Sequence, residues 1–124
     1  MTDFVNDAEK AMKKLSSGNM VTTGQIRKFL TAVNTVTGKV DQFKRGQKGT
    51  KLPEDLQMQV KFLKVKLAYQ IGRMGKPVKD FSDETHMMAW IDSIGDSVEK
   101  YERFARYVEA LVAFHKYYSA WRDK

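Results

Sequence analysis

Residues 53–74 read PEDLQMQVKFLKVKLAYQIGRM and contain the pattern that decides the fold. At 3.6 residues per turn, one apolar stripe falls on a single helix face and comprises Leu56, Val60, Leu63, Leu67, Ile71 and Met74. A second apolar stripe, comprising Met58, Phe62, Val65 and Tyr69, falls on roughly the opposite face. Because both faces are apolar, the pattern predicts a helix that is buried on two sides at the centre of a helical bundle.

Positively charged side chains separate the two stripes of this predicted helix. Lys61 and Lys64 follow one edge, and Lys66 and Arg73 follow the other. Any contact that the helix makes with solvent or with a ligand is therefore expected to be basic.

The chain before this helix also has helical spacing. The apolar residues between Phe4 and Leu15 predict a short N-terminal helix, which the sequence Ser16-Ser17-Gly18 ends. Thr22 or Thr23 is a suitable N-cap for a second helix, which Gly46 ends.

The chain after the helix shows two more sets of start and stop signals. Gly75 is expected to close residues 53–74, with Pro77 preventing continuation. Ser82 is expected to cap a fourth helix that ends at Gly95, and Asp96 with Glu99 has capping-box spacing for the last helix. Since no stretch alternates as a strand does, the sequence predicts an all-α, single-domain bundle of about five helices.

Length and composition set further limits. A chain of 124 residues with 42% hydrophobic residues suits one domain, residues 1–124, with one core. It has no cysteine, which excludes disulfides and thiolate metal sites. Neither a signal peptide nor a membrane-spanning run of about 18 apolar residues is visible, so the expected location is the cytoplasm.

The positive charge is concentrated in the middle of the chain. Residues 26–79 have thirteen Lys and Arg against three acids, a net charge of +10, whereas residues 80–124 have six against nine, a net charge of −3. A local excess of this kind is typical of proteins that bind nucleic acids, and a solvated basic face is the alternative. Because few acids are interleaved, local ion pairs are not expected to neutralise these bases, and the sequence favours a polyanionic partner.

The sequence offers little to a catalytic mechanism. His86 and His115 lie on different predicted helices without the spacing of a metal-binding pair, and His115 lies on an apolar face, which is typical of a core histidine. No nucleophile elbow, phosphate-binding loop or pair of catalytic carboxylates is present. The sequence therefore predicts a protein that is not an enzyme and that needs neither a metal nor another cofactor.

Four segments in a fixed order resemble one family. They are Val21–Leu30 (VTTGQIRKFL), Phe62–Arg73 (FLKVKLAYQIGR), Val78–Phe81 (VKDF) and Tyr107–Tyr118 (YVEALVAFHKYY). The chain resembles the small α-helical subunit of type III-A CRISPR effector complexes, the Csm class. The likeness covers most of residues 20–120, and residues 1–19 are interpreted as a possible divergent N-terminal helix.

The resemblance implies a non-catalytic subunit of an antiviral, RNA-guided complex. It implies several copies that stack head to tail along the duplex of guide RNA and target RNA, in contact with other subunits. A basic face would then hold phosphates, while base pairing would read the sequence. The positions that the resemblance implies to face RNA are Arg27, Lys28, Lys64, Lys66 and Arg73, and helix geometry alone adds Lys61.

Two other functions remain open from the sequence. The first is a free-standing helical DNA-binding protein in which the second helix and residues 53–74 form a helix-turn-helix; the length and the two apolar faces of residues 53–74 weigh against it. The second is a protein-interaction module with an incidental basic face. Salt-dependent binding of RNA that is indifferent to sequence would distinguish the CRISPR subunit from both.

Overall fold

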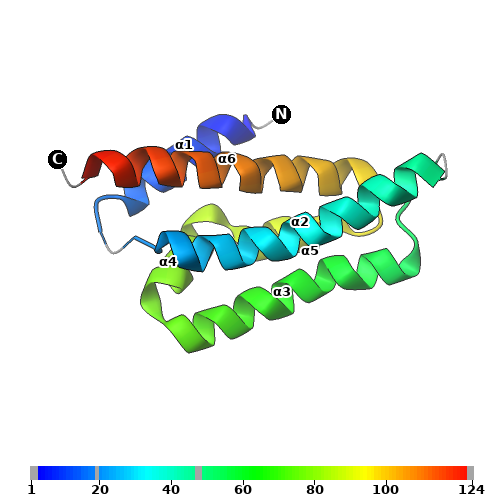
Figure 1. The fold of residues 1–124 in the computed structure, drawn as a ribbon, viewed down its shortest axis with the longest axis horizontal. Coiled ribbons are helices and arrows are strands. Elements are labelled where there is room, and N and C mark those ends of the chain that lie inside the picture. Colours follow the sequence, from blue (N-terminus) through cyan, green and yellow to red (C-terminus); the bar gives the residue numbers. More distant parts are fainter. Residues whose placement is uncertain (1–2, 19, 47–48, 123–124) are drawn as a thin grey trace.

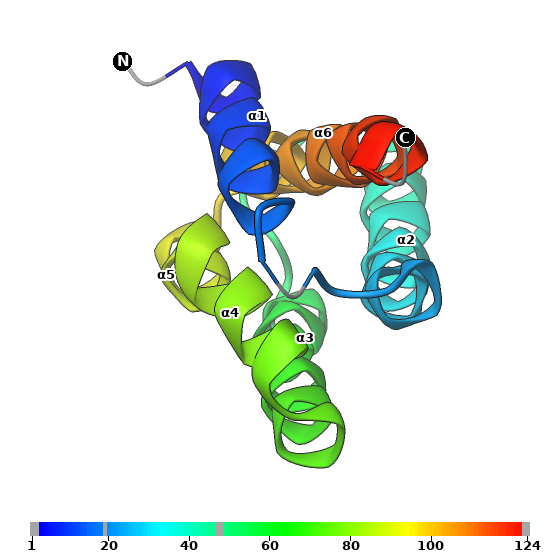
Figure 2. The same cartoon turned by 90° about the vertical axis from the view of Figure 1, so that its left-hand side faces the viewer.

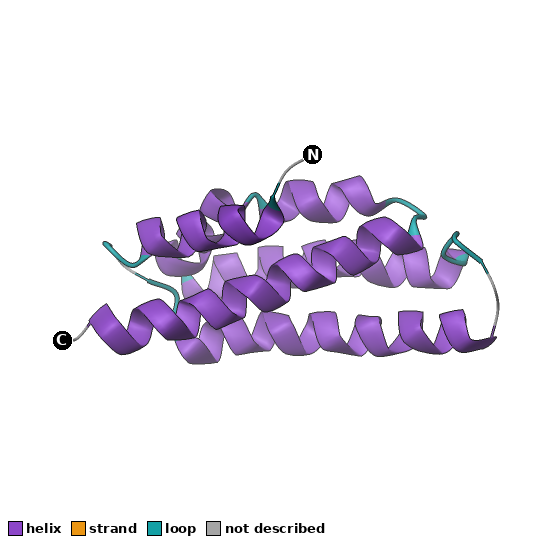
Figure 3. Cartoon of the chain, turned by 90° about the horizontal axis from the view of Figure 1, so that it is seen from above, coloured by secondary structure: helices purple, strands orange, loops and turns teal. Residues whose placement is uncertain are grey.

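The computed structural model describes residues 3–18, 20–46 and 49–122, and no side chain is described from residue 120 onward. Six helices account for most of this part of the chain, and Figure 3 shows loops as the only other element. They are α1 (Phe4–Leu15), α2 (Thr23–Gly46), α3 (Glu54–Met74), α4 (Lys76–Thr85), α5 (Met87–Ile94) and α6 (Val98–Arg122). The prediction of an all-α bundle is confirmed, with six helices where about five were expected.

The long helices α2, α3 and α6 give the bundle its length (Figure 1). Helix α6 packs against α1, α2 and α5, while α3 packs against α2, α4 and α5. Seen end-on in Figure 2, α6 and α3 lie at opposite sides of the bundle, with α2 on one flank and α4 and α5 on the other. The core between them is filled by large, fully buried side chains, among them Met12, Leu67, Tyr101, Phe104 and Leu111.

Helix α3 is buried on one face only. Its first stripe is buried at Leu56, Val60, Leu63 and Leu67. The second stripe is exposed: 62% of Met58, 51% of Phe62, 52% of Val65 and 68% of Tyr69 is accessible to solvent. The prediction of a central helix buried on two sides is therefore wrong, because no other described helix packs against the outer face of α3. We call Met58, Phe62, Val65 and Tyr69 the outer stripe.

Several helix boundaries follow the predicted capping signals. Thr22 and Gln25 form a reciprocal capping box at the start of α2, with hydrogen bonds of 2.9 and 3.1 Å between each side chain and the other residue's backbone NH group. Gly75 ends α3 in a conformation with φ of 85° that favours glycine.

Two predicted caps are wrong. Ser82 is buried inside α4, which starts directly after Gly75 and carries Pro77 in its first turn. The last helix is capped by Ser97 rather than Asp96, since the Lys100 NH group donates to Ser97 Oγ over 3.1 Å. The Asp96 carbonyl instead accepts from the Leu52 NH group, which ties the α2–α3 connection to the α5–α6 connection.

His86 separates α4 from α5 in a left-handed backbone conformation, with φ of 56° and ψ of 36°. A side chain in this region costs about 1 kcal/mol relative to glycine. We expect His86→Gly to raise the free energy of unfolding by about 1 kcal/mol, measured by urea denaturation. His86→Ala keeps the strained Cβ and is the control, so an equal gain in both variants would contradict the explanation by backbone strain.

Candidate nucleic-acid interface

Helices α2 and α3 lie antiparallel and side by side, and two hydrogen bonds identify the edges that face each other. Gln70 Nε2 donates to the Gln25 carbonyl over 2.6 Å at one end. Lys39 Nζ donates to Gln59 Oε1 over 2.8 Å toward the other end. Figure 1 shows the two helices running along most of the bundle's length.

Four bases follow these facing edges. Lys28 lies on the same edge of α2 as Lys39, eleven residues or about three turns away. On α3, Lys66 and Arg73 lie on the edge of Gln59, at intervals of seven residues or about two turns. We call Lys28, Lys39, Lys66 and Arg73 the α2–α3 edge.

The charges of this edge are not neutralised within the described part of the chain. Lys28, Lys66 and Arg73 are exposed and form no hydrogen bond or ion pair with any described residue, and the only partner of Lys39 there is the neutral amide of Gln59. Since unpaired bases retain their full attraction for anions and these four lie along two adjacent helices, the α2–α3 edge is a candidate site for phosphate.

The other three predicted RNA-binding residues lie elsewhere. Lys64 points to α5, where its Nζ lies 2.9 and 3.0 Å from the two carboxylate oxygens of Asp92. Arg27 lies on the side of α2 that faces α6, together with Leu30 and Asn34. Lys61 lies across the outer stripe from Lys66. The structure thus brings together Lys28, Lys66 and Arg73 but separates them from Lys64, Arg27 and Lys61.

Lys39 is the one member of the α2–α3 edge that was not predicted to bind RNA. Its distance of eleven residues from Lys28 is a helical repeat that identifies a shared edge, so the signal was present in the sequence.

Many of the other bases in residues 26–79 have acidic partners, contrary to the expectation that they would stay unneutralised. Besides Lys64, the paired bases are Lys44 with Glu102, Lys51 with Asp96, Lys76 with Asp80, and Lys79 with Asp83. All of the acids come from residues 80–102, so the charge asymmetry between the two parts of the chain is partly cancelled by the fold. The hydrogen bond from Lys79 to Asp83 raises the pKa of the lysine.

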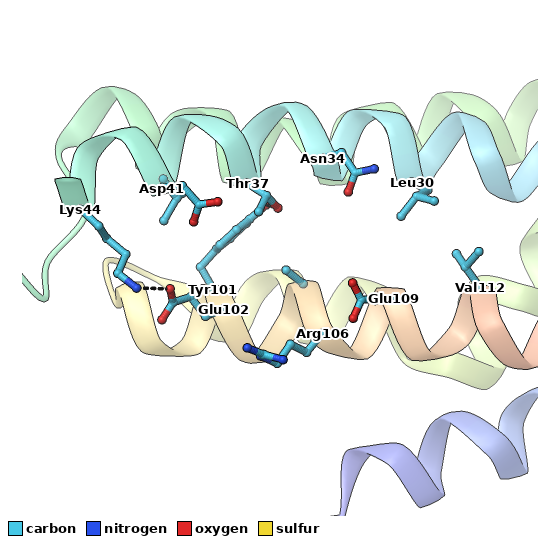
Figure 4. Close-up of a pocket in the computed structure, with 12 residues that line it drawn as sticks. Leu30, Asn34, Thr37, Asp41, Lys44, Tyr101, Glu102, Arg106, Glu109 and Val112 are labelled. Atoms are coloured by element: carbon cyan, nitrogen blue, oxygen red, sulfur yellow. Dashed lines mark hydrogen bonds and ion pairs between the residues drawn. The ribbon is translucent and has the colours of Figure 1, made fainter. Parts of the chain in front are cut away.

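A surface groove with a volume of about 540 Å³ lies between α2 and α6 (Figure 4). Its floor includes Leu30 and Val112 at one end, and the ion pair of Lys44 and Glu102 closes the other end. Acids and bases both line it, namely Asp41, Lys44, Glu102, Arg106 and Glu109. This mixture of charges suits a nucleic-acid backbone less well than the α2–α3 edge.

The two histidines have distinct environments. His115 is 3% exposed and its Nε2 lies 2.6 Å from the Val21 carbonyl, which confirms the prediction of a core histidine. His86 is exposed at the α4–α5 junction. Within residues 3–18, 20–46 and 49–122, no three side chains of His, Asp or Glu gather in a way that could hold a metal ion. None of the helices in that part of the chain is long and apolar enough to cross a membrane.

Comparison with known proteins identifies the family. The family model described as Csm2 Type III-A matches residues 1–120. The chain belongs to the Csm2 family. The resemblance found in the sequence is thereby confirmed, and the span of the Csm2 match includes α1, which was interpreted as a possible divergent addition.

Individual Csm2 proteins are similar over nearly the whole chain. The "CRISPR system Cms protein Csm2" of Mycobacterium tuberculosis strain H37Rv is 33% identical over 117 residues, which are 93% of this chain and 90% of the relative. The protein of the same name from Streptococcus thermophilus is 32% identical over 120 residues, 94% of this chain and 91% of the relative. The one from Enterococcus italicus is 33% identical over 102 residues, 81% of this chain and 69% of the relative.

Proposed function

We propose that this Csm2-family chain is a non-catalytic small subunit of a type III-A CRISPR effector complex. Several copies stack head to tail along the duplex of guide RNA and target RNA, beside other subunits of the complex. The α2–α3 edge holds the phosphate backbone, and base pairing between guide and target reads the sequence.

One observation carries this proposal beyond family membership. Lys28, Lys66 and Arg73 remain unpaired along two adjacent helices, whereas acids from residues 80–102 neutralise many of the other bases in residues 26–79. Long basic side chains on a rigid helical edge can follow a phosphate backbone without contacting base edges. The contacts are thus expected to be independent of sequence.

The alternative of a DNA-binding helix-turn-helix is disfavoured by the same geometry. Helix α3 has 21 residues and lies antiparallel to α2 along most of its length, rather than crossing it after a short turn. Its outward face presents the outer stripe, which is apolar and lacks the polar side chains that read base edges.

A salt titration of target-RNA affinity in the assembled complex tests the proposal. Affinity for RNA decreases as salt rises, and each phosphate contact adds about 0.7 to 0.9 to the magnitude of the slope of log affinity against log salt. In the triple variant Lys28→Gln, Lys66→Gln, Arg73→Gln we therefore expect this magnitude to be smaller by about 2 to 3. The decrease in target-RNA affinity should be the same for targets of unrelated sequence, each with its matching guide RNA.

The control for this variant has the same change in net charge at another place. Lys10, Lys13 and Lys116 are exposed and have no side-chain ion pair with a described residue, so their triple replacement by Gln should leave the slope unchanged. Equal losses in both triple variants would show a general charge effect and contradict the assignment to the α2–α3 edge. Lys64→Gln should change the slope less than Lys66→Gln, since Asp92 already neutralises Lys64.

A further inference from the structure

The outer stripe has the spacing of a helix-pairing surface. Its four members follow one another at intervals of four, three and four residues, which is the spacing of the core positions in a coiled coil. They extend over about 16 Å of α3. Four of the six large hydrophobic side chains that are exposed in the described part of the chain belong to it. A concentration of this kind on one helix marks an interaction site.

We propose that two copies of this chain pair through their outer stripes, with the two α3 helices antiparallel about a twofold axis. If the axis passes between positions 63 and 64, Met58 lies against the second copy's Tyr69, and Phe62 against the second copy's Val65. Every member of the stripe then has an apolar partner. Each of these two kinds of pair combines an aromatic ring with a side chain that has no ring. This pairing concerns the protein without RNA and is independent of the proposed function.

The charges beside the stripe suit the antiparallel arrangement. Asp55, in the first turn of α3, comes to lie beside the second copy's Arg73, which has no acidic partner among the described residues of its own chain. At the middle of the interface, Gln59 lies opposite Lys66 and Ala68 lies opposite Lys61, so that no two bases face each other directly. A parallel arrangement would instead place Lys61 of each copy beside the second copy's Lys66, a pairing of like charges that is unfavourable.

The size of the interface predicts its strength. One stripe of four side chains from each copy belongs to the small end of specific protein interfaces, which bind weakly. We expect the dimer in sedimentation equilibrium at about 100 µM protein and above, and the monomer at much lower concentration. Val65→Ser should abolish the dimer, and Val5→Ser is the matched control, since Val5 is 49% exposed on α1 and Val65 is 52% exposed.

Cysteine cross-linking tests the orientation, because the natural chain has no cysteine that would interfere. We expect an equimolar mixture of Met58→Cys and Tyr69→Cys to be linked by a short bismaleimide, since antiparallel pairing places these positions in one layer. Each variant alone should remain unlinked, because the two copies of the same position lie about 16 Å apart. Linking of the single variants would indicate parallel pairing and overturn the proposal.

Charge exchange gives a second measurement. Asp55→Arg should weaken the dimer at least tenfold, and Asp55→Arg combined with Arg73→Asp should restore it. Two outcomes would overturn the proposal: a protein that stays monomeric at 1 mM, or a self-association that Val65→Ser does not reduce. A chain of copies that grows beyond the dimer would show docking of the stripe into another surface, such as the α2–α6 groove, and would also overturn it.

Discussion

Replacing Leu67 by alanine is expected to lower the free energy of unfolding by about 2–5 kcal/mol, whereas replacing Phe62 by alanine should change it by no more than about 0.5 kcal/mol. Leu67 is fully buried and its truncation leaves a cavity in the core, while Phe62 is 51% exposed on the outer face of the same helix. Urea denaturation at a protein concentration low enough to keep the chain monomeric provides the measurement.

Two valines on α3 provide a matched control for this comparison. Val60 is 1% exposed and Val65 is 52% exposed, so the same substitution to alanine removes the same atoms from the two faces of one helix. Only Val60→Ala should destabilise the protein measurably. If Phe62→Ala cost as much as Leu67→Ala, the outer stripe would have to be packed against another part of the chain.

Alkaline pH is expected to destabilise the protein through two buried tyrosines. Tyr101 donates a hydrogen bond to the Val33 carbonyl over 3.0 Å, and Tyr107 donates one to the Thr85 carbonyl over 3.1 Å. Burial, which disfavours the charged phenolate, raises the pKa of each tyrosine to about 12.

The sign of the effect follows from linkage. In the unfolded chain a tyrosine loses its proton near pH 10, whereas in the folded chain these two keep it up to about pH 12. Between these values the folded state binds more protons, so the free energy of unfolding falls as the pH rises. Each tyrosine should lower the free energy of unfolding by about 2–3 kcal/mol at pH 12, whereas it should have no such effect below about pH 9.

Substitution by phenylalanine isolates these contributions. Tyr101→Phe should be less stable than the wild type by about 1 kcal/mol at pH 7, through loss of a hydrogen bond, yet lose less stability between pH 9 and pH 12. Tyr69→Phe, at an exposed position of the outer stripe, is the control and should follow the wild-type curve. A Tyr101→Phe curve parallel to the wild-type curve would contradict the assignment.

The helices themselves could be predicted because their signals are local. Apolar residues at helical spacing predicted α1, α2, α3 and α6, and Thr22 and Gly75 marked two of the boundaries correctly. Ser82 was misread as a cap, since serine is suitable both before a helix and, as here, at a buried position inside one. His86 separates α4 from α5 through its left-handed backbone conformation, and histidine is not a residue type that predicts this conformation from the sequence.

Only one of the two predicted buried faces of α3 is buried in the structure. The spacing of apolar residues shows that a helix has an apolar face, but it does not show whether a neighbour covers that face. Leu67 and Phe62 have equally apolar neighbours along the helix, and only the arrangement of α2, α4 and α5 makes one buried and the other exposed.

The candidate site depends on contacts that are distant in sequence. Lys64 and Lys66 are two residues apart in a basic run, yet Asp92, 28 residues after Lys64, neutralises the first and leaves the second free. Long-range pairing of this kind cannot be deduced from charge patterning along the chain, which is why Lys64 was predicted to bind RNA. Lys39 was missed for another reason, since it lies outside the four segments that carry the family resemblance.

The outer face of α3 separates two kinds of selection within one helix. Substitutions at Leu63 or Leu67 alter the core and are subject to selection for folding. Substitutions at Met58, Phe62, Val65 or Tyr69 are expected to leave the stability of the chain nearly unchanged, because these side chains are exposed. The outer stripe is thus expected to tolerate changes without loss of the fold, so that selection at those four positions would act through what the face contacts rather than through folding.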